Sequence, residues 1–433
     1  MFNLNDNLKN KKFLIYGYGK SGSSAHNYLK KNNKIFIYDD NKKPNKFFTS
    51  LKKIKLIKFD YIVLSPGIDI NQCKLKNYLK KNRNKIITDL DIFYLNNQKN
   101  LKITITGTNG KSTTAKLLFE ILRDQKKDVI LAGNIGIPIL SNRKIKPSSI
   151  FIIEASSYQL EYSKYFKTDY AFILNISPDH LERHKSIQKY TQAKFKLILN
   201  QSKNYYAFIE NNKYLNREIK KYKNISKIIK INKNNTRIKK LISNSYFDNI
   251  NNLNNLSFIF EFAKKYKLNK YKLLKTVNLF KGLEFRQQVI YKNKFVTIIN
   301  DSKSTSFSSS INLLRSYKNI FWILGGLAKK GDKFKLNSKY YKNITCYIFG
   351  KDKKFFIKKL NKNIPSKSYR NLEIILRIIA EKIKLNKNKH SHILFSPSAA
   401  SFDQFKNFED RGNYFNNLLK KIKFIKKINA QSK

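Results

Sequence analysis

The residues with the clearest chemistry lie in segment 101–114, LKITITGTNGKSTT. A β-branched run at 103–106 is typical of a buried strand, and a glycine-containing loop follows it before a helix begins. Backbone N–H groups in such a loop, together with the positive end of the helix, bind phosphate. Lys111 could reach the terminal phosphates of a nucleotide, and the Ser112 hydroxyl could ligate Mg²⁺. The predicted phosphate loop comprises Gly107, Thr108, Asn109, Gly110, Lys111, Ser112 and Thr113.

This loop does not complete the G-x-x-x-x-G-K-[ST] pattern, because Ile105 occupies the position of the first glycine. A glycine-rich turn that binds nothing is therefore the alternative. Since the strand, the loop, the lysine and the hydroxyl are all in place, the segment favours an enzyme that uses ATP.

A second glycine-rich turn, at 17–22, matches G-x-G-x-x-G directly after a short apolar run. Asp39 ends the next predicted strand about 20 residues on, where dinucleotide-binding proteins carry a ribose-binding acid. Alone, this pattern predicts an NAD or FAD domain, but a nucleotide diphosphate at the same helix N-terminus fits equally well. Because an NAD enzyme has no use for the phosphate loop at 107–113, the two turns together favour an ATP enzyme with a nucleotide-linked substrate.

Further candidates lie between residues 150 and 200. Glu154 closes the apolar run SIFIIEASS, where a carboxylate suits Mg²⁺, although a capping or salt-bridging role is equally compatible. His180 and His184 have the spacing H-x-x-x-H, which matches no zinc hydrolase motif. We expect His180 to join an ATP/Mg²⁺ site and His184 to lie on the surface. From its spacing on an amphipathic helix, Lys194 is predicted to be a surface lysine.

Two polar clusters follow predicted strands in the C-terminal third. The first, NDSKST at 300–305, combines a carboxylate, a lysine and hydroxyls, which could bind phosphate or a carboxylate. An ordinary helix N-cap explains it as well. The second cluster, SPSAASFD at 396–403, follows another apolar run in the same way.

Three successive α/β segments must position these residues, since apolar strand-like runs alternate with helical patterns along the chain. The near-continuous apolar runs are typical of parallel strands that are covered on both faces, and open α/β sheets bind ligands at the carboxyl ends of their strands. We predict a Rossmann-like N-terminal domain at 1–97, a central P-loop ATPase-like domain at 98–282 and a Rossmann-like C-terminal domain with a parallel sheet at 283–433.

The composition adds a strong positive charge, with 89 Lys+Arg against 28 Asp+Glu in 433 residues. A nucleic-acid binder would explain this charge, but the lysines are spread over every predicted helix and loop and accompany no RNP, KH or zinc-finger pattern. A lysine-rich coding bias explains it better, and we expect no specific nucleic-acid partner.

No apolar run approaches the ~18 residues of a membrane span, and we expect a cytoplasmic protein without a signal peptide. Cys73 and Cys346 are expected to be buried free thiols.

Several of these motifs, in this order, resemble the Mur ligase family over nearly the whole chain: GTNGKST, AGNIG, EASSYQLE, NISPDHLERH, QAKFKLI, GLEFRQQ, NDSKST and SPSAASFDQFKNFEDRG. The last two motifs are the most specific, because other Mur ligases share the phosphate loop but are expected to differ at these two segments. The resemblance implies the three-domain architecture of that family and an ATP-dependent ligase with two Mg²⁺ sites. It implies that D-glutamate is joined to UDP-N-acetylmuramoyl-L-alanine (UDP-MurNAc-L-Ala) in peptidoglycan precursor synthesis, by a protein we expect to be a monomer.

The resemblance also implies roles for individual residues. The UDP-linked substrate would contact Gly17, Gly19, Ser21, Gly22, Asp39, Ser65, Pro66, Gly67 and Asn134. ATP would contact the phosphate loop, Asn252, Arg286 and Asp301. One Mg²⁺ would be held by Ser112 and Glu154, and the second by His180 and a carbamylated Lys194. Lys111, His180, Lys194 and Lys303 would be catalytic, and D-glutamate would be held by Thr305, Lys329, Ser401 and Phe408.

Two positions depart from the family pattern. Phe285 and Asn251 each stand where the family has a histidine, whereas the neighbouring Arg286 and Asn252 are kept. We therefore expect nucleotide binding to be retained. A folylpolyglutamate synthase would share the phosphate loop but should lack the UDP-type first domain. A nucleic-acid-stimulated ATPase is another alternative, and a nonenzymatic homologue is disfavoured because the predicted catalytic residues are present.

Overall fold

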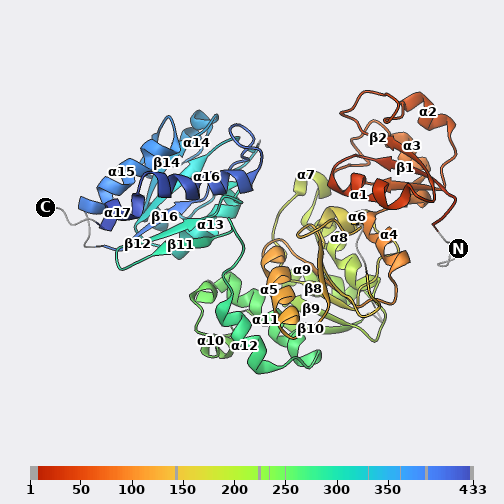
Figure 1. Ribbon diagram of the computed structural model, residues 1–433, viewed down its shortest axis with the longest axis horizontal. Helices are drawn as coiled ribbons and strands as arrows, with labels where there is room; N and C mark the ends of the chain where they lie inside the picture. Colours follow the sequence, from red (N-terminus) through yellow and green to blue (C-terminus); the bar gives the residue numbers. More distant parts are fainter. Residues whose placement is uncertain are drawn as a thin grey trace. The chain divides into compact units, whose positions relative to one another are not determined.

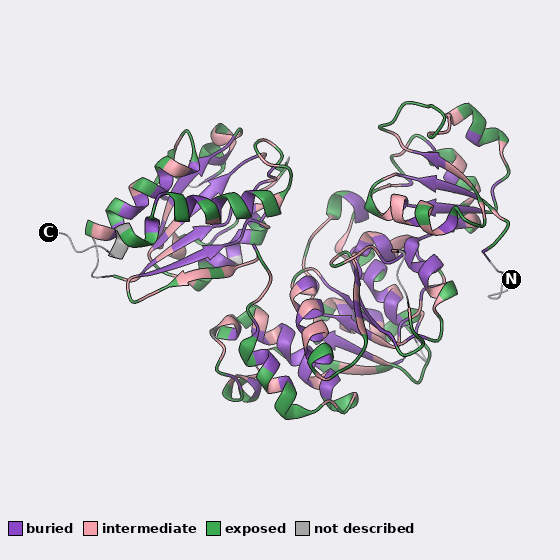
Figure 2. Ribbon diagram, in the orientation of Figure 1, coloured by how far each residue is buried: buried purple, intermediate pink, exposed green. Residues whose placement is uncertain are grey.

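Two compact units, Met1–Phe280 and Lys281–Lys433, make up the chain in a computed structural model (Figure 1). The structure describes residues 8–141, 145–222, 226–233, 235–248, 250–329, 331–360, 362–385 and 389–429. Figure 2 shows the buried residues along the strands and on the inward faces of the helices. Among the described helices, none is both long and apolar enough to cross a membrane.

The first unit begins with a four-stranded parallel sheet in the order β2-β1-β3-β4. Its strands are β1 (Lys12–Tyr16), β2 (Lys34–Tyr38), β3 (Tyr61–Leu64) and β4 (Ile86–Ile87). Its helices are α1 (Lys20–Leu29), α2 (Leu51–Leu56), α3 (Lys76–Lys81) and α4 (Asp89–Asn96).

A six-stranded parallel sheet follows in the same unit, in the order β10-β9-β8-β5-β7-β6. Its strands are β5 (Lys102–Thr106), β6 (Val129–Gly133), β7 (Ile150–Glu154), β8 (Tyr170–Ile173), β9 (Tyr206–Glu210) and β10 (Lys227–Ile231). Its helices are α5 (Lys111–Asp124), α6 (Ser157–Tyr162), α7 (Leu181–His184), α8 (Ile187–Leu199), α9 (Lys213–Lys221), α10 (Thr236–Lys240), α11 (Ile250–Lys265) and α12 (Lys270–Leu279). Every residue of the central strands β5 and β7 is buried, because helices cover both faces of this sheet.

These two sheets form one unit because they share a hydrophobic core. The Phe93 ring on α4 lies 4.7 Å from the Phe151 ring on β7, centroid to centroid. The buried carboxylate of Asp91 accepts hydrogen bonds from the Ser163 hydroxyl and from the N–H groups of residues 164–166. Helix α4 therefore joins the first sheet to the second, and the boundary near residue 97 remains a prediction.

The second unit contains a six-stranded sheet in the order β11-β12-β16-β13-β14-β15. Its strands are β11 (Gln288–Lys292), β12 (Val296–Asn300), β13 (Ile320–Gly325), β14 (Ile344–Phe349), β15 (Ser366–Ser368) and β16 (Ser391–Phe395). Its helices are α13 (Phe307–Ser316), α14 (Lys353–Lys359), α15 (Leu372–Leu385), α16 (Phe408–Lys421) and α17 (Phe424–Asn429).

The predicted α/β class is confirmed in all three sheets, but the third sheet is not wholly parallel. Strand β11 pairs antiparallel with β12. The connection between them is too short for the crossover that parallel strands require. Asn293 instead closes a hairpin by accepting the N–H groups of Phe295 and Val296.

Candidate functional site

The predicted phosphate loop connects β5 to α5, and two of its glycines have backbone angles that other residues rarely adopt. Gly107 has φ +148° and Gly110 has φ +83°. A Cβ on Gly110 would lie 2.2 Å from Nδ2 of Asn255 on α11, so a side chain there would be both strained and in collision. The Lys111 ammonium donates to the carbonyls of Gly107 at 2.9 Å and Thr108 at 2.7 Å.

The loop is fixed to the carboxyl end of the neighbouring strand β8. The N–H of Thr108 donates to the Asn175 carbonyl, and the N–H of Asn109 donates to Oδ1 of Asn175 at 2.8 Å. The Thr108 hydroxyl lies 3.2 Å from the hydroxyl of Tyr190 on α8. The backbone of the predicted phosphate loop is therefore held in place by residues that lie far away in the sequence.

Glu154 lies at the carboxyl end of β7 and is almost completely buried. Its Oε1 accepts a hydrogen bond from Nδ2 of Asn134 at 2.9 Å. Its Oε2 is buried and has no hydrogen-bond partner among the residues that the structure describes. A buried carboxylate oxygen without a donor is costly, and a bound cation would satisfy it.

Lys194 is buried, so the prediction of a surface lysine from its spacing on α8 is wrong. Its ammonium donates to the carbonyl of Gly107 at 2.9 Å and lies 4.7 Å from the ring centroid of Tyr190. Burial lowers the pKa of Lys194 well below the usual value for lysine, and the positive charge of Lys111 acts in the same direction. This amine is therefore held beside the phosphate loop in an environment that favours its neutral form.

The two histidines around α7 differ from each other. His180 has φ +53°, and its Nδ1 lies 2.9 Å from the Tyr158 hydroxyl. His184, expected on the surface, is buried, and its Nε2 lies 3.0 Å from the Ser157 hydroxyl. Burial lowers the pKa of His184 to about 4, so this ring is neutral at neutral pH. The surface prediction failed because α6 and α8 cover α7.

The first glycine-rich turn is also closed by contacts with other strand ends. The N–H of Gly17 donates to the Tyr38 carbonyl, and the Ser65 hydroxyl donates to the Gly17 carbonyl at 2.6 Å. Oδ2 of Asp39 accepts the N–H of Tyr18 at 2.8 Å. The predicted contacts of the UDP-linked substrate include Gly17, Asp39 and Ser65, which directly follow β1, β2 and β3. The structure thus brings these three residues together at one edge of the first sheet.

Asp301 and Lys303 follow β12 in the second unit. Oδ1 of Asp301 accepts the N–H of Gln287 at 3.1 Å, and Oδ2 accepts the Ser396 hydroxyl at 2.8 Å. Burial raises the pKa of the Asp301 carboxyl to about 7. The Lys303 ammonium lies 4.0 Å from the ring centroid of Phe408. The two polar clusters of the C-terminal third therefore meet at the same edge of the sheet.

The other predicted contacts of D-glutamate and ATP differ in exposure. Thr305 and Lys329 are exposed, Phe408 is partly buried and Ser401 is buried. Asn252, at the start of α11, donates from Nδ2 to the Tyr246 carbonyl at 3.0 Å. The N–H of Arg286 donates to the Leu283 carbonyl, in the turn that precedes β11.

Comparison with known proteins agrees with this arrangement. The chain is 32% identical to the UDP-N-acetylmuramoylalanine–D-glutamate ligase of Rickettsia felis over 94% of its own length and 96% of that relative. It is 32% identical to the enzyme of the same name from Francisella tularensis subsp. novicida, over 97% of this chain and 98% of that one. The model of the Mur ligase middle domain matches residues 105–273. The chain belongs to the Mur ligase family.

Solved structures of Mur ligases show the same fold at low sequence identity. The UDP-N-acetylmuramate–alanine ligase of Thermotoga maritima has a TM-score of 0.57 and 14% identity, covering 95% of this chain and 100% of that one. The MurF ligase of the same organism, solved in complex with ADP, has a TM-score of 0.54 and 16% identity, with 98% of each chain covered.

A divalent cation fits the residues that the family resemblance assigns to it in this Mur ligase. The buried Oε2 of Glu154 lacks a donor, and the Ser112 hydroxyl is buried at the start of α5. Hard cations such as Mg²⁺ take oxygen ligands of this kind and keep several waters. Within the described ranges, no cluster of three or more His, Cys, Asp or Glu forms a metal site by itself.

Several residues of the Mur ligase sites were not singled out from the sequence. Asn255, Asn175 and Tyr190 contact the phosphate loop, and Arg411 is completely buried in the second unit. Asn175 could have been found, because it follows β8 at the sheet edge where open α/β sheets bind ligands.

The prediction for the two cysteines was half right: Cys346 is buried, whereas Cys73 is only partly buried, and both are free thiols.

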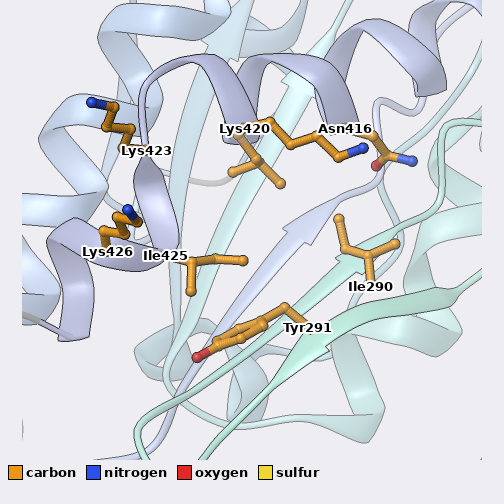
Figure 3. Close-up of a pocket in the computed structure, with 8 residues that line it drawn as sticks. Ile290, Tyr291, Asn416, Lys420, Lys423, Ile425 and Lys426 are labelled. Carbon is orange, nitrogen blue, oxygen red and sulfur yellow. The ribbon is translucent and has the colours of Figure 1, made fainter.

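A hollow of about 440 Å³ in the second unit contains none of the predicted site residues (Figure 3). Ile290 and Tyr291 on β11 line it together with Leu419 and Ile425, and three lysines, Lys420, Lys423 and Lys426, also line it. Asn416 also lines the hollow, and its Oδ1 accepts a hydrogen bond from Nδ2 of Asn300, the residue before Asp301.

Proposed function

We propose that this chain joins D-glutamate to UDP-MurNAc-L-Ala and consumes ATP, as the names of its relatives indicate for those proteins. The observation that carries the proposal is 32% identity to a UDP-N-acetylmuramoylalanine–D-glutamate ligase over 94% of the chain. The presence of every predicted catalytic residue supports it, as does the closed phosphate loop beside Lys111 and Lys194.

The reaction has two steps. A carboxylate oxygen of the alanyl group attacks the γ-phosphorus of ATP, which forms an acyl phosphate and releases ADP. The amine of D-glutamate then attacks the acyl carbon, the tetrahedral intermediate collapses, and phosphate leaves with the new amide bond in place. Both steps build up negative charge, so their rates depend on positioned positive groups.

The chain's own residues supply this positive charge in separate places. Lys111 exchanges its hydrogen bonds to the loop carbonyls for contacts with the β- and γ-phosphates. Lys303 neutralises charge on the oxygens of the reacting carbonyl. Ser112 and Glu154 would hold one Mg²⁺, and His180 and a carbamylated Lys194 the other; when bound, the ions would neutralise phosphate charge.

Carbamylation of Lys194 is part of the proposal. The neutral amine attacks the carbon of CO₂, an N–C bond forms, and one proton is released. The low pKa of Lys194 supports this step because only the neutral amine is nucleophilic. The product is a carboxylate-like group, which can ligate a cation where an ammonium cannot.

We assign the UDP-linked substrate to a domain at 1–97, ATP to a domain at 98–282 and D-glutamate to a domain at 283–433. We further propose that the protein acts as a monomer in the cytoplasm, where ATP and nucleotide-linked precursors are available.

The deciding experiment is ATP-dependent ligation of UDP-MurNAc-L-Ala with a panel of amino acids. We expect product and phosphate with D-glutamate, and neither with L-glutamate, L-alanine or diaminopimelate. Lys111→Ala is the matched negative control, since it should keep the fold and lose the reaction. Preferential use of another amino acid would assign the chain to a different reaction within the family.

A further inference from the structure

A completely buried arginine in the first turn of α16 forms no direct ion pair with a carboxylate of the described residues. Arg411 has 0% of its surface exposed. Among the described residues, the arginine–carboxylate ion pairs involve Arg123, Arg183 and Arg377, and Arg411 forms none. Burial lowers the pKa of Arg411 to about 10, so the guanidinium is still charged at neutral pH. The charges of Asp403 and Asp301 favour the charged form of Arg411, but neither carboxylate forms an ion pair with it among the described residues. A buried cation that lacks a direct ion pair is costly, which points to a role other than stability.

The guanidinium instead donates to backbone and hydroxyl oxygens of two loops. Its Nη2 donates to the Ser302 carbonyl at 2.6 Å, and its Nε donates to the Ser302 hydroxyl at 3.0 Å. Its Nη1 donates to the Ala399 carbonyl at 2.9 Å. Ser302 belongs to the cluster after β12 and Ala399 to the cluster after β16, so one planar group fixes the spacing between them.

The start of α16 and one further loop join the same centre. The Ser302 hydroxyl donates in turn to the Phe408 carbonyl at 2.8 Å. Leu327 and Ala400 exchange two backbone hydrogen bonds of 2.9 Å, and a Cβ on Gly326 would lie 3.3 Å from Nη1 of Arg411. The loop after β13 is thus held against the loop after β16.

The segments that meet at Arg411 are those expected to bind the amino-acid substrate. These expected contacts are Thr305, Lys329, Ser401 and Phe408. These residues come from four separate parts of the chain. The geometry of a binding site built in this way depends on the groups that hold its loops in place.

We propose that Arg411 is a positioning residue for the D-glutamate site, which it forms by locking the loops after β12 and β16 onto α16. The proposal rests on the proposed function. The charge of Arg411 also adds positive potential at an edge that would receive a dicarboxylate.

The test compares Arg411→Lys with the matched control Arg377→Lys, which changes an exposed arginine on α15 that is paired with Glu373. Lysine keeps the charge but has no planar fork, so it cannot span Ser302 and Ala399 together. We expect Arg411→Lys to raise the KM for D-glutamate about tenfold or more and to leave the KM for ATP within about twofold. The control should change neither KM.

A partial reaction separates positioning from general damage. Acyl phosphate formation precedes the use of D-glutamate, so single-turnover release of ADP from ATP and UDP-MurNAc-L-Ala without D-glutamate should be kept in Arg411→Lys. Equal loss of the partial reaction and of ligation, or equal increases in both KM values, would overturn the proposal.

A second variant covers the case in which Arg411→Lys does not fold. Ser302→Ala removes the hydroxyl that links the Nε of Arg411 to the Phe408 carbonyl, and it leaves the Ser302 carbonyl in place. It should raise the KM for D-glutamate in the same direction by a smaller factor, and an unchanged KM would count against the proposal. A wild-type protein that releases ADP but does not ligate D-glutamate would overturn the proposed function, and this inference with it.

Discussion

The carboxyl of Asp301 should make the stability of the second unit depend on pH, and Asp301→Asn should remove this dependence. The carboxyl is almost completely buried between the N–H of Gln287 and the hydroxyl of Ser396. Asparagine has the same shape and is neutral, so it resembles the protonated acid over the whole pH range.

The size of the effect follows from the pKa of Asp301, which burial raises from 3.8 to about 7. Between these two values the unfolded chain has released this proton and the folded chain still holds it. Stability therefore falls as the pH rises from about 4 to about 7, and the fall ends above about pH 7. At ~1.4 kcal/mol per pH unit, the wild type should lose about 4 kcal/mol relative to Asp301→Asn over this range.

Trp322 gives this measurement a local probe. It is the one tryptophan of the chain, it is buried in β13, and its Nε1 donates to the carbonyl of Ser396 at 2.8 Å. Urea unfolding followed by tryptophan fluorescence therefore reports on the sheet that contains Asp301. The free energy of unfolding falls by ~2 kcal/mol per M of urea. The difference between the urea midpoints of the wild type and Asp301→Asn should therefore change by about 2 M from pH 4 to pH 7.

The control is Glu381→Gln, which changes an exposed carboxylate on α15 of the same unit. Its pH profile should be that of the wild type. If Asp301→Asn and the wild type also have parallel profiles, Asp301 does not hold its proton to neutral pH, and the reasoning from burial is refuted.

Four further outcomes are expected. Lys111→Ala should lower kcat by about 10²–10³ and keep the wild-type circular dichroism, and retention of more than about a tenth of kcat would exclude this loop as the ATP site. Lys194→Ala should be nearly inactive and partly restored by a short-chain carboxylic acid; mass spectrometry of the active, CO₂-equilibrated wild type should show a carbamate, and a free amine would contradict this. Gly412→Ala would place a Cβ 2.2 Å from the Phe285 ring, so it should lower the free energy of unfolding by about 1–3 kcal/mol, and Phe285→Ala in the same chain should recover part of the loss, as urea titration would show. Lys329→Ala should raise the KM for D-glutamate far more than that for ATP, and equal increases in steady-state assays would argue against a contact with the substrate.

Much of the fold could be predicted because it depends on short-range patterns. The apolar runs at 150–154, 170–173 and 320–325 are strands β7, β8 and β13 in the structure. Each run is continuous because both faces of its sheet are covered, so no partner needs to be known to recognise it. The hairpin of β11 with β12 was missed because β11 is only partly buried and has a weak apolar pattern.

The candidate site was predictable to a different extent in its two parts. The phosphate loop could be recognised from the glycines and the lysine that the chain carries in one stretch, whereas the contacts that fix it come from Asn175 and Tyr190 on other segments. Lys194 could not be recognised from its own spacing, and only the family resemblance singled it out. Arg411 gave no local signal, because its three hydrogen bonds go to Ser302 and Ala399 on other segments.

By itself, the sequence determined the α/β class, the strand that carries the phosphate loop, and the family whose motifs it shares, because all of these depend on residue types at short, fixed spacings. Only the tertiary structure decided which charged groups are buried. The Lys194 ammonium meets the carbonyl of Gly107, 87 positions away in the chain, and this contact takes it out of water. Desolvation depends on what packs around a group in space, and therefore the lowered pKa of Lys194 and the raised pKa of Asp301 become apparent only in the folded chain.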